Sequence, residues 1–248
     1  YLVPQILAND AKGFLDTVEK LKMYGYDEVN LNLGCPSKTV VSKGRGSGFL
    51  IHTEKLERFL DEIYAKADVK ISIKTRIGKY DADEWGQLLD IYNKYPVEEL
   101  IVHPRVQQQF YKGHPDLDAF ADAVKECRHP LCYNGDIFTV EDMERLKKRF
   151  PEISCVMLGR GILRNPELTD IIESGGGRID VKKLRAFHDQ IFQDYQEVSS
   201  GDKNVFKMKE LWCYLGTLFP DKEKQLKKIR KAEKLDRYEA AIEEILYF

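Results

Sequence analysis

Cys35 is the side chain whose position in the sequence best suits chemistry. It stands between Gly34 and Pro36, after an alternating segment at residues 28–33 and before a glycine-rich loop at residues 43–48. Gly and Pro interrupt strands, so the thiol is expected at the mouth of a strand, where it can meet a ligand. No Ser or His pattern nearby suggests a hydrolase triad. Such a thiol can act as a nucleophile, as a ligand, or as a general acid that protonates carbon; the alternative is a buried, inert thiol.

Two further expected strands end in basic side chains. Lys74 closes residues 69–74, and His103 closes residues 99–103. A cation there can stabilise an electron-rich ring, and His103 can hydrogen-bond it. The alternatives are a surface lysine and a structural histidine. Lys74 continues a polar alternation along its strand, which favours the inner face for this residue.

Glycine-containing turns follow the last two expected strands, at residues 130–134 and 153–158. Glycines let backbone N–H groups approach an anion, and an arginine adds a charge-assisted bond. In eight-stranded barrels, the loops after strands seven and eight often bind phosphate. The residues predicted for this role are Asn134, Gly135, Asp136, Gly159 and Arg160.

Six strand–helix repeats must position these residues, beginning with a short strand at residues 4–8. The expected helices are 11–24, 84–94, 117–127, 139–149 and 166–173, and one after Thr53 that includes Leu56 and Ile63; Asp10, Thr53 and Thr139 are the expected helix caps. Without hairpin signals, the repeats predict parallel βαβ units. A doubly wound sheet usually shows GxGxxG after its first strand, and none is present. We therefore predict an α/β fold, a (β/α)8 TIM barrel with six units in this chain. The usual barrel size of about 250 residues implies two units before Tyr1.

A purely helical pattern follows the glycines at residues 174–177. Helices are expected at 181–198, 204–218, 221–234 and 236–247. We predict a catalytic barrel domain over residues 1–173 and a helical bundle domain over residues 178–248. Residues 222–237 carry eight basic and three acidic side chains, which fits either a solvated helix face or a phosphate-binding surface.

The composition describes a folded chain of 248 residues with a net charge of -2. No apolar run reaches the roughly 20 residues that cross a bilayer, so we expect no membrane segment. The five cysteines are scattered without a CxxC pair, which predicts neither a metal site nor a disulfide framework and favours a reducing cytoplasm. The cysteines expected to be inert are Cys127, Cys132, Cys155 and Cys213.

Residues 32–36, Asn-Leu-Gly-Cys-Pro, together with Gly-Arg-Gly-Ser-Gly at 44–48, resemble the signature of the tRNA-dihydrouridine synthases. The resemblance continues through residues 74–76, 103–105, 134–136, 159–166 and 207–214. That family is an FMN-bearing barrel whose C-terminal helical domain helps to hold tRNA. It reduces uridine to 5,6-dihydrouridine with NADPH.

The resemblance implies a role for individual residues. Cys35 corresponds to the general acid that protonates C5 of uracil while hydride goes to C6, and the glycine-rich loop is expected to be mobile and to close over the base. Asn32 corresponds to a residue that faces the uracil, and Arg76 to one that orients it. The resemblance also implies FMN-binding roles for Gln5, Lys74, His103, Asn134, Gly135, Asp136, Gly159 and Arg160. On the basic helix, tRNA is expected to contact Lys227, Lys228 and Lys231.

Two other functions fit a chain of this kind. One is an FMN barrel oxidoreductase that acts on a small molecule of the dihydroorotate or dihydropyrimidine type. The other is a non-catalytic RNA-binding barrel protein. The basic helix favours tRNA over a small substrate, and flavin binding would separate an enzyme from a binding protein. We expect a monomer.

Overall fold

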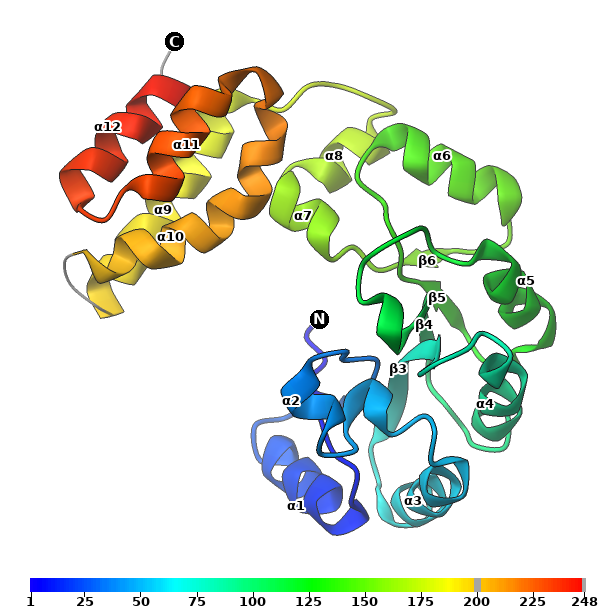
Figure 1. The fold of residues 1–248 in the computed structure, drawn as a ribbon. Coiled ribbons are helices and arrows are strands. Elements are labelled where there is room, and N and C mark those ends of the chain that lie inside the picture. Colours follow the sequence, from blue (N-terminus) through cyan, green and yellow to red (C-terminus); the bar gives the residue numbers. More distant parts are fainter. Residues whose placement is uncertain (199–201, 247–248) are drawn as a thin grey trace. The chain divides into compact units, whose positions relative to one another are not determined.

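The computed structural model describes residues 1–198 and 202–246, which fall into two compact units. The first unit holds residues 1–135 and 146–157, and the second holds residues 136–145 and those described from 158 onward. The strands, all in the first unit, are β1 (Gln5–Ile6), β2 (Glu28–Leu33), β3 (Lys70–Gly78), β4 (Leu100–Val106), β5 (Leu131–Tyr133) and β6 (Cys155–Val156) (Figure 1).

Helices connect these strands. The α-helices of the first unit are α1 (Ala11–Lys22), α2 (Lys38–Val41), α3 (Thr53–Lys66), α4 (Glu84–Tyr92) and α5 (Leu117–Glu126). Two short 3₁₀ helices, η1 (Gly46–Gly48) and η2 (Gln107–Gln109), follow β2 and β4. Helix α6 (Val140–Arg149) has residues in both units.

The six strands form one parallel sheet, in the order in which they occur in the chain. Helices α1, α3, α4 and α5 follow one another along the same side of that sheet (Figure 1). This arrangement results when successive right-handed crossovers all lie on one side, as in a (β/α)8 barrel. A doubly wound sheet changes direction at a switch point and carries helices on both faces. The α/β prediction is confirmed, and closure into eight strands stays a prediction.

Alternation along β2 determines which face of the sheet meets the helices. Val29, Leu31 and Leu33 are completely buried, while Asn30 and Asn32 point to the opposite, inner face. This matches the alternation of residues 28–33 in the sequence. The outer face forms the hydrophobic contact with the helices, and polar side chains are left to line the inner face.

A buried pair of hydroxyl groups links β3 to α4 on the outer face. Thr75 Oγ1 lies 3.0 Å from Tyr92 Oη, and both side chains are fully buried. Burial raises the pKa of Tyr92, so its hydroxyl stays protonated. Because Thr75 faces outward, its neighbours Lys74 and Arg76 face inward.

Strands β3 and β4 run past their predicted ends at residues 74 and 103. They continue to pair with each other through Arg76 and His103 and again at Gly78 and Val106. The prediction that Lys74 and His103 close their strands is therefore wrong, because mutual backbone pairing extends both strands. Lys74 and His103 therefore lie within strands and not at their ends.

Two of the three predicted helix caps are confirmed. Asp10 accepts a hydrogen bond from the Gly13 backbone N–H at 2.7 Å, and Thr139 Oγ1 accepts one from the Asp142 N–H at 3.2 Å. The Thr53 prediction is wrong, because Thr53 is the first helical residue of α3 and His52 occupies the cap position.

The second unit is built on helices. They are α7 (Arg160–Arg164), α8 (Leu168–Glu173), α9 (Val181–Val198), α10 (Lys203–Leu215), η3 (Gly216–Leu218), η4 (Pro220–Lys222), α11 (Glu223–Lys231) and α12 (Leu235–Leu246). Residue 247, the predicted end of the last helix, lies outside the described residues. A core that includes Met208, Trp212 and Ile242 holds α9 to α12 together. None of the described helices is both long enough and apolar enough to cross a membrane.

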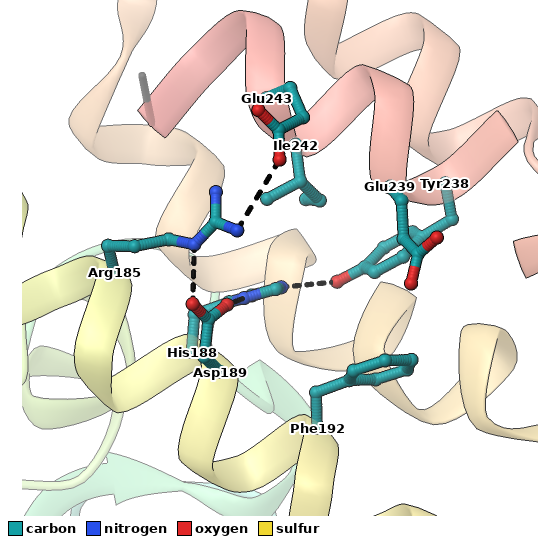
Figure 2. A pocket seen from close by; sticks show the side chains of 8 residues that line it. All are labelled: Arg185, His188, Asp189, Phe192, Tyr238, Glu239, Ile242 and Glu243. Carbon is teal, nitrogen blue, oxygen red and sulfur yellow. Dashed lines mark hydrogen bonds and ion pairs between the residues drawn. The ribbon is translucent and has the colours of Figure 1, made fainter. Parts of the chain in front are cut away.

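A polar cluster lies inside this helical unit, beside a cavity of about 160 Å³ (Figure 2). His188 Nε2 is 2.8 Å from Tyr238 Oη, and its Nδ1 is 2.8 Å from Asp189 Oδ1. Trp212 Nε1 donates to the same Tyr238 oxygen at 2.9 Å. Since an indole N–H can only donate, the Tyr238 hydroxyl can give its own proton to His188 Nε2. The neutral imidazole then donates from Nδ1 to Asp189.

Acid is expected to destabilise the helical unit through His188. Burial lowers the pKa of His188 below 6.5, although Asp189 opposes the shift. The unfolded chain therefore binds a proton that the folded chain excludes. The contribution of His188 to the free energy of unfolding is fully present above about pH 6.5. It falls as the pH is lowered, by at most about 1.4 kcal/mol per pH unit. Burial opposes ionisation of Asp189 too, but the bonds from Arg185 and His188 keep its pKa below the ordinary value, so it stays charged in this range.

Thermal unfolding from about pH 7 to about pH 5 measures this effect in the wild type and in His188→Gln. The variant should lose the part of the pH dependence that comes from the imidazole. Equal pH dependence in the two proteins would show that His188 does not titrate on unfolding.

Candidate active site

Polar residues on the inner face of the sheet form a connected ladder. Asn32 Nδ2 donates to Gln5 Oε1 at 2.6 Å, and Gln5 Nε2 donates to Asn30 Oδ1 at 2.8 Å. Asn30 Nδ2 continues the ladder to Ser72 Oγ at 3.1 Å. Gln5 and Asn32, predicted from the sequence for the flavin and the uracil, therefore bond to each other. Their amide orientations are set by these bonds before any ligand arrives.

The turn that carries Cys35 is held by the same Asn32. Its Oδ1 accepts hydrogen bonds from the backbone N–H groups of Gly34 at 3.0 Å and Cys35 at 2.9 Å. The Cys35 carbonyl in turn accepts two bonds from Ser47, one from its N–H at 3.1 Å and one from its hydroxyl at 2.8 Å. Cys35 is thus positioned from both sides, and the residue is partly exposed.

The glycine-rich loop after Cys35 is a packed element. Its residues Gly46 and Ser47 are buried in η1. Gly46 has a φ of +54°, and a Cβ atom there would lie 2.8 Å from the Cys35 carbonyl oxygen. Glycine at this position permits close approach to Cys35, and the expected mobility of the loop stays a prediction. The loop supports the turn.

Lys74 presents a half-buried ammonium group on the inner face, opposite Asn32 in the strand register. Burial, followed by the charge of Arg76, lowers its pKa to about 8, while the nearby thiols of Cys132 and Cys35 oppose the shift. Among the residues that the structure describes, none accepts a hydrogen bond from this ammonium. A buried amine without an acceptor is costly, so this position suits an electron-rich ligand.

Arg76 cross-links the loops around the site. Its side chain is 1% exposed. Nε donates to the Gly34 carbonyl at 3.0 Å, Nη1 to Val106 at 3.0 Å and Nη2 to Phe110 at 2.7 Å. Burial lowers its pKa to about 10, which leaves it charged at neutral pH. All three nitrogens thus join the Cys35 turn to the loop after β4.

His103 is buried beside Arg105 and Tyr111, for which no role is predicted from the sequence. Its Nε2 lies 3.1 Å from Arg105 Nη1; a guanidinium only donates, so Nε2 is the acceptor. The ring of Tyr111 stacks on His103 with centroids 6.1 Å apart and lies 5.5 Å from the Arg76 guanidinium. Tyr111 is 50% exposed, so an aromatic face borders the site.

The geometry on the inner face can be compared with known proteins. A family model described as dihydrouridine synthase matches residues 1–245. The chain belongs to the dihydrouridine synthase family.

Curated proteins similar to this dihydrouridine synthase chain carry related names. A probable tRNA-dihydrouridine synthase of Staphylococcus aureus is 30% identical over 173 residues, which are 66% of this chain and 51% of that protein. The corresponding Staphylococcus epidermidis protein is 28% identical over 204 residues, or 79% and 61%. The tRNA-dihydrouridine synthase B of Pasteurella multocida is 27% identical over 153 residues, or 61% and 46%. The chain spans about half the length of these curated relatives.

The residues predicted to bind phosphate in this dihydrouridine synthase chain belong to both units. In the first unit, Asn134 Nδ2 donates to the Met157 carbonyl at 2.9 Å. Gly135 is required beside the Tyr133 ring, because a Cβ atom would lie 2.0 Å from the Tyr133 hydroxyl oxygen. These contacts give both residues local structural roles.

In the second unit, Gly159 precedes Arg160, the first residue of α7. The Arg160 guanidinium pairs with Asp136 and lies 5.5 Å from the Phe138 ring. Asp136 therefore orients the arginine, and its negative charge argues against direct contact with a phosphate.

The three lysines predicted to meet tRNA are exposed on α11 of the second unit. They are not equivalent. Lys228 pairs with Glu244 of α12 at 2.5 Å. Lys227 and Lys231, four residues apart and hence on one side of the helix, have no ion-pair partner among the described residues.

Proposed function

We propose that this chain reduces uridine in tRNA to 5,6-dihydrouridine, with FMN as cofactor and NADPH as reductant. Membership of the dihydrouridine synthase family supports the reaction class. The observation that carries the proposal is the half-buried Lys74 ammonium, which lies on the same face as Asn32 and close to Cys35 and has no acceptor among the described residues.

The inner-face residues fit a flavin ring. The Lys74 ammonium suits the electron-rich edge of the ring, and the Gln5 amide and the His103 imidazole lie on the same face. Bound FMN would supply hydride to C6 of the uracil. The phosphate contacts expected of Asn134, Gly135, Asp136, Gly159 and Arg160 stay predictions.

The chain's own residues supply the proton and the pocket. We infer that the Cys35 thiol gives its proton to C5, since Asn32 and Ser47 hold its backbone on either side. Arg76 keeps the turn in place, and the half-exposed Tyr111 ring offers a surface on which a flipped base can stack.

A reconstitution assay tests the proposed reaction. Purified protein supplied with FMN, NADPH and tRNA that lacks dihydrouridine should form dihydrouridine in that tRNA. Reduction of a free dihydroorotate-type or dihydropyrimidine-type substrate, with tRNA left unchanged, would favour the small-molecule oxidoreductase. Failure to bind flavin would favour a non-catalytic RNA-binding protein.

The basic helix should contact tRNA through Lys227 and Lys231. In Lys227→Gln/Lys231→Gln, the slope of log affinity against log salt should fall by about 2, because two phosphate contacts are lost. Lys228→Gln, in the same helix, is the matched control and should change the slope less, because Glu244 already engages Lys228. Filter binding at several salt concentrations measures both. A larger effect of Lys228→Gln would contradict this assignment.

A further inference from the structure

We propose that Glu99, Cys132 and Cys155 form a binding site for a soft divalent cation such as Zn²⁺. A carboxylate oxygen and two sulfur atoms lie within 4.8 Å of one another, all in the first unit. Zinc bonds of about 2.0–2.3 Å in tetrahedral geometry place ligand atoms about 3.3–3.8 Å apart. Side-chain rotation can close the remaining difference.

The strand register brings these three residues to one face. Cys132 of β5 lies directly opposite Cys155 of β6 and opposite Ile101 of β4. Neighbours in register on parallel strands point the same way. Glu99 precedes Ile101 by two residues, so it shares that face. Lys74, opposite Ile101 in β3, shows that this is the inner face.

A cation that binds here must displace the protons of the two thiols. Burial, the Cys155 thiol and the Glu99 carboxylate raise the pKa of Cys132, and burial also raises that of Cys155. The thiols therefore stay protonated without a cation. A divalent cation reverses this preference, and its binding releases the two thiol protons to solvent.

The ligand types also restrict the metal. Thiolates select zinc and similar soft ions over Mg²⁺ and Ca²⁺. Three protein ligands leave the fourth tetrahedral position for water. Strands β5 and β6 contain only three and two residues, so a metal that joins them to the start of β4 would reinforce a weakly paired part of the sheet.

Cobalt titration of the reduced protein in the absence of oxygen tests the site. One Co²⁺ per chain should give a thiolate-to-cobalt absorption band, and Zn²⁺ should displace it and raise the melting temperature. Cys132→Ser and Cys155→Ser should lose the band. Glu99→Gln should weaken binding at least about tenfold, since even outer-shell changes cost this much. Cys127→Ser is the matched control, because Cys127 is a partly buried thiol that donates to the His129 carbonyl, and it should keep the band.

Three results would overturn the proposal. One is a folded, reduced wild-type protein without a thiolate band. The second is a band that survives in both Cys132→Ser and Cys155→Ser. A disulfide between these cysteines in the purified protein, with no cobalt band after reduction, would also reject the metal and assign the pair to redox chemistry. Circular dichroism confirms folding, and Glu99→Gln keeps both cysteines in place if a serine variant does not fold.

Discussion

Cys35→Ala should form dihydrouridine about 10²–10⁴ times more slowly than the wild type while still binding flavin. The range is that of a lost general acid. The hydrogen bonds that shape the turn involve the backbone of Cys35 and the side chains of Asn32 and Ser47, so alanine leaves them intact. Dihydrouridine formation and flavin absorbance, measured on the same sample, separate the chemical step from cofactor binding.

Cys213→Ala provides the control for this experiment. Cys213 is an exposed thiol on α10, and its removal should leave both measurements unchanged. Full activity of Cys35→Ala would remove Cys35 from the reaction. A single-turnover experiment with flavin already reduced adds a sharper readout, because the variant should fail at the step that needs tRNA and retain reduction by NADPH.

Arg76→Met should destabilise the first unit by about 3 kcal/mol or more. The substitution leaves three carbonyl groups without their charged donor, and each unsatisfied buried group costs about 1–3 kcal/mol. Urea unfolding measures the free energy of unfolding. Arg58→Met is the control, since Arg58 is exposed on α3 and, within the described part of the chain, bonds only the Glu54 carbonyl; it should change stability by less than about 0.5 kcal/mol.

The same variant distinguishes two roles for Arg76. If it also orients the uracil, as the sequence resemblance implies, Arg76→Met should lose more activity than its lower stability explains. If it chiefly holds the Cys35 turn against the loop after β4, stability and activity should fall together. Arg76→Lys keeps the charge but lacks the planar fork, so under the second role it should recover only part of the stability.

The sequence predicted those features that depend on local patterns. Alternation of Val29, Asn30 and Leu31 is enough to place the inner and outer faces of β2, because side chains alternate along any strand. Asp10 is recognisable as a cap because its partner lies three residues away. Cys35 could be selected because it follows the carboxyl end of β2. Lys74 could be selected because the polar alternation along its strand places it on the inner face.

Features that depend on distant partners could not be predicted in this way. Tyr111 reaches His103 because Phe110 adopts a left-handed φ of +51° and its carbonyl is held by Arg76. Nothing in the local sequence signals that bond. The sequence predicts that Cys132 and Cys155 are inert. Their approach to each other could not be predicted, since it depends on the register between two strands that are separated by a helix.

Through the Thr75–Tyr92 hydroxyl pair, the helix layer helps to determine which side chains of β3 face the site on the other side of the sheet. If β3 slid by one residue against α4, Thr75 would turn inward, and the charges of Lys74 and Arg76 would be forced among the apolar side chains of the helices. The pair therefore helps to fix the position of β3 against α4. Substitutions at Tyr92 of α4 should therefore alter flavin affinity, and genetic screens for loss of activity should recover them alongside changes at Cys35.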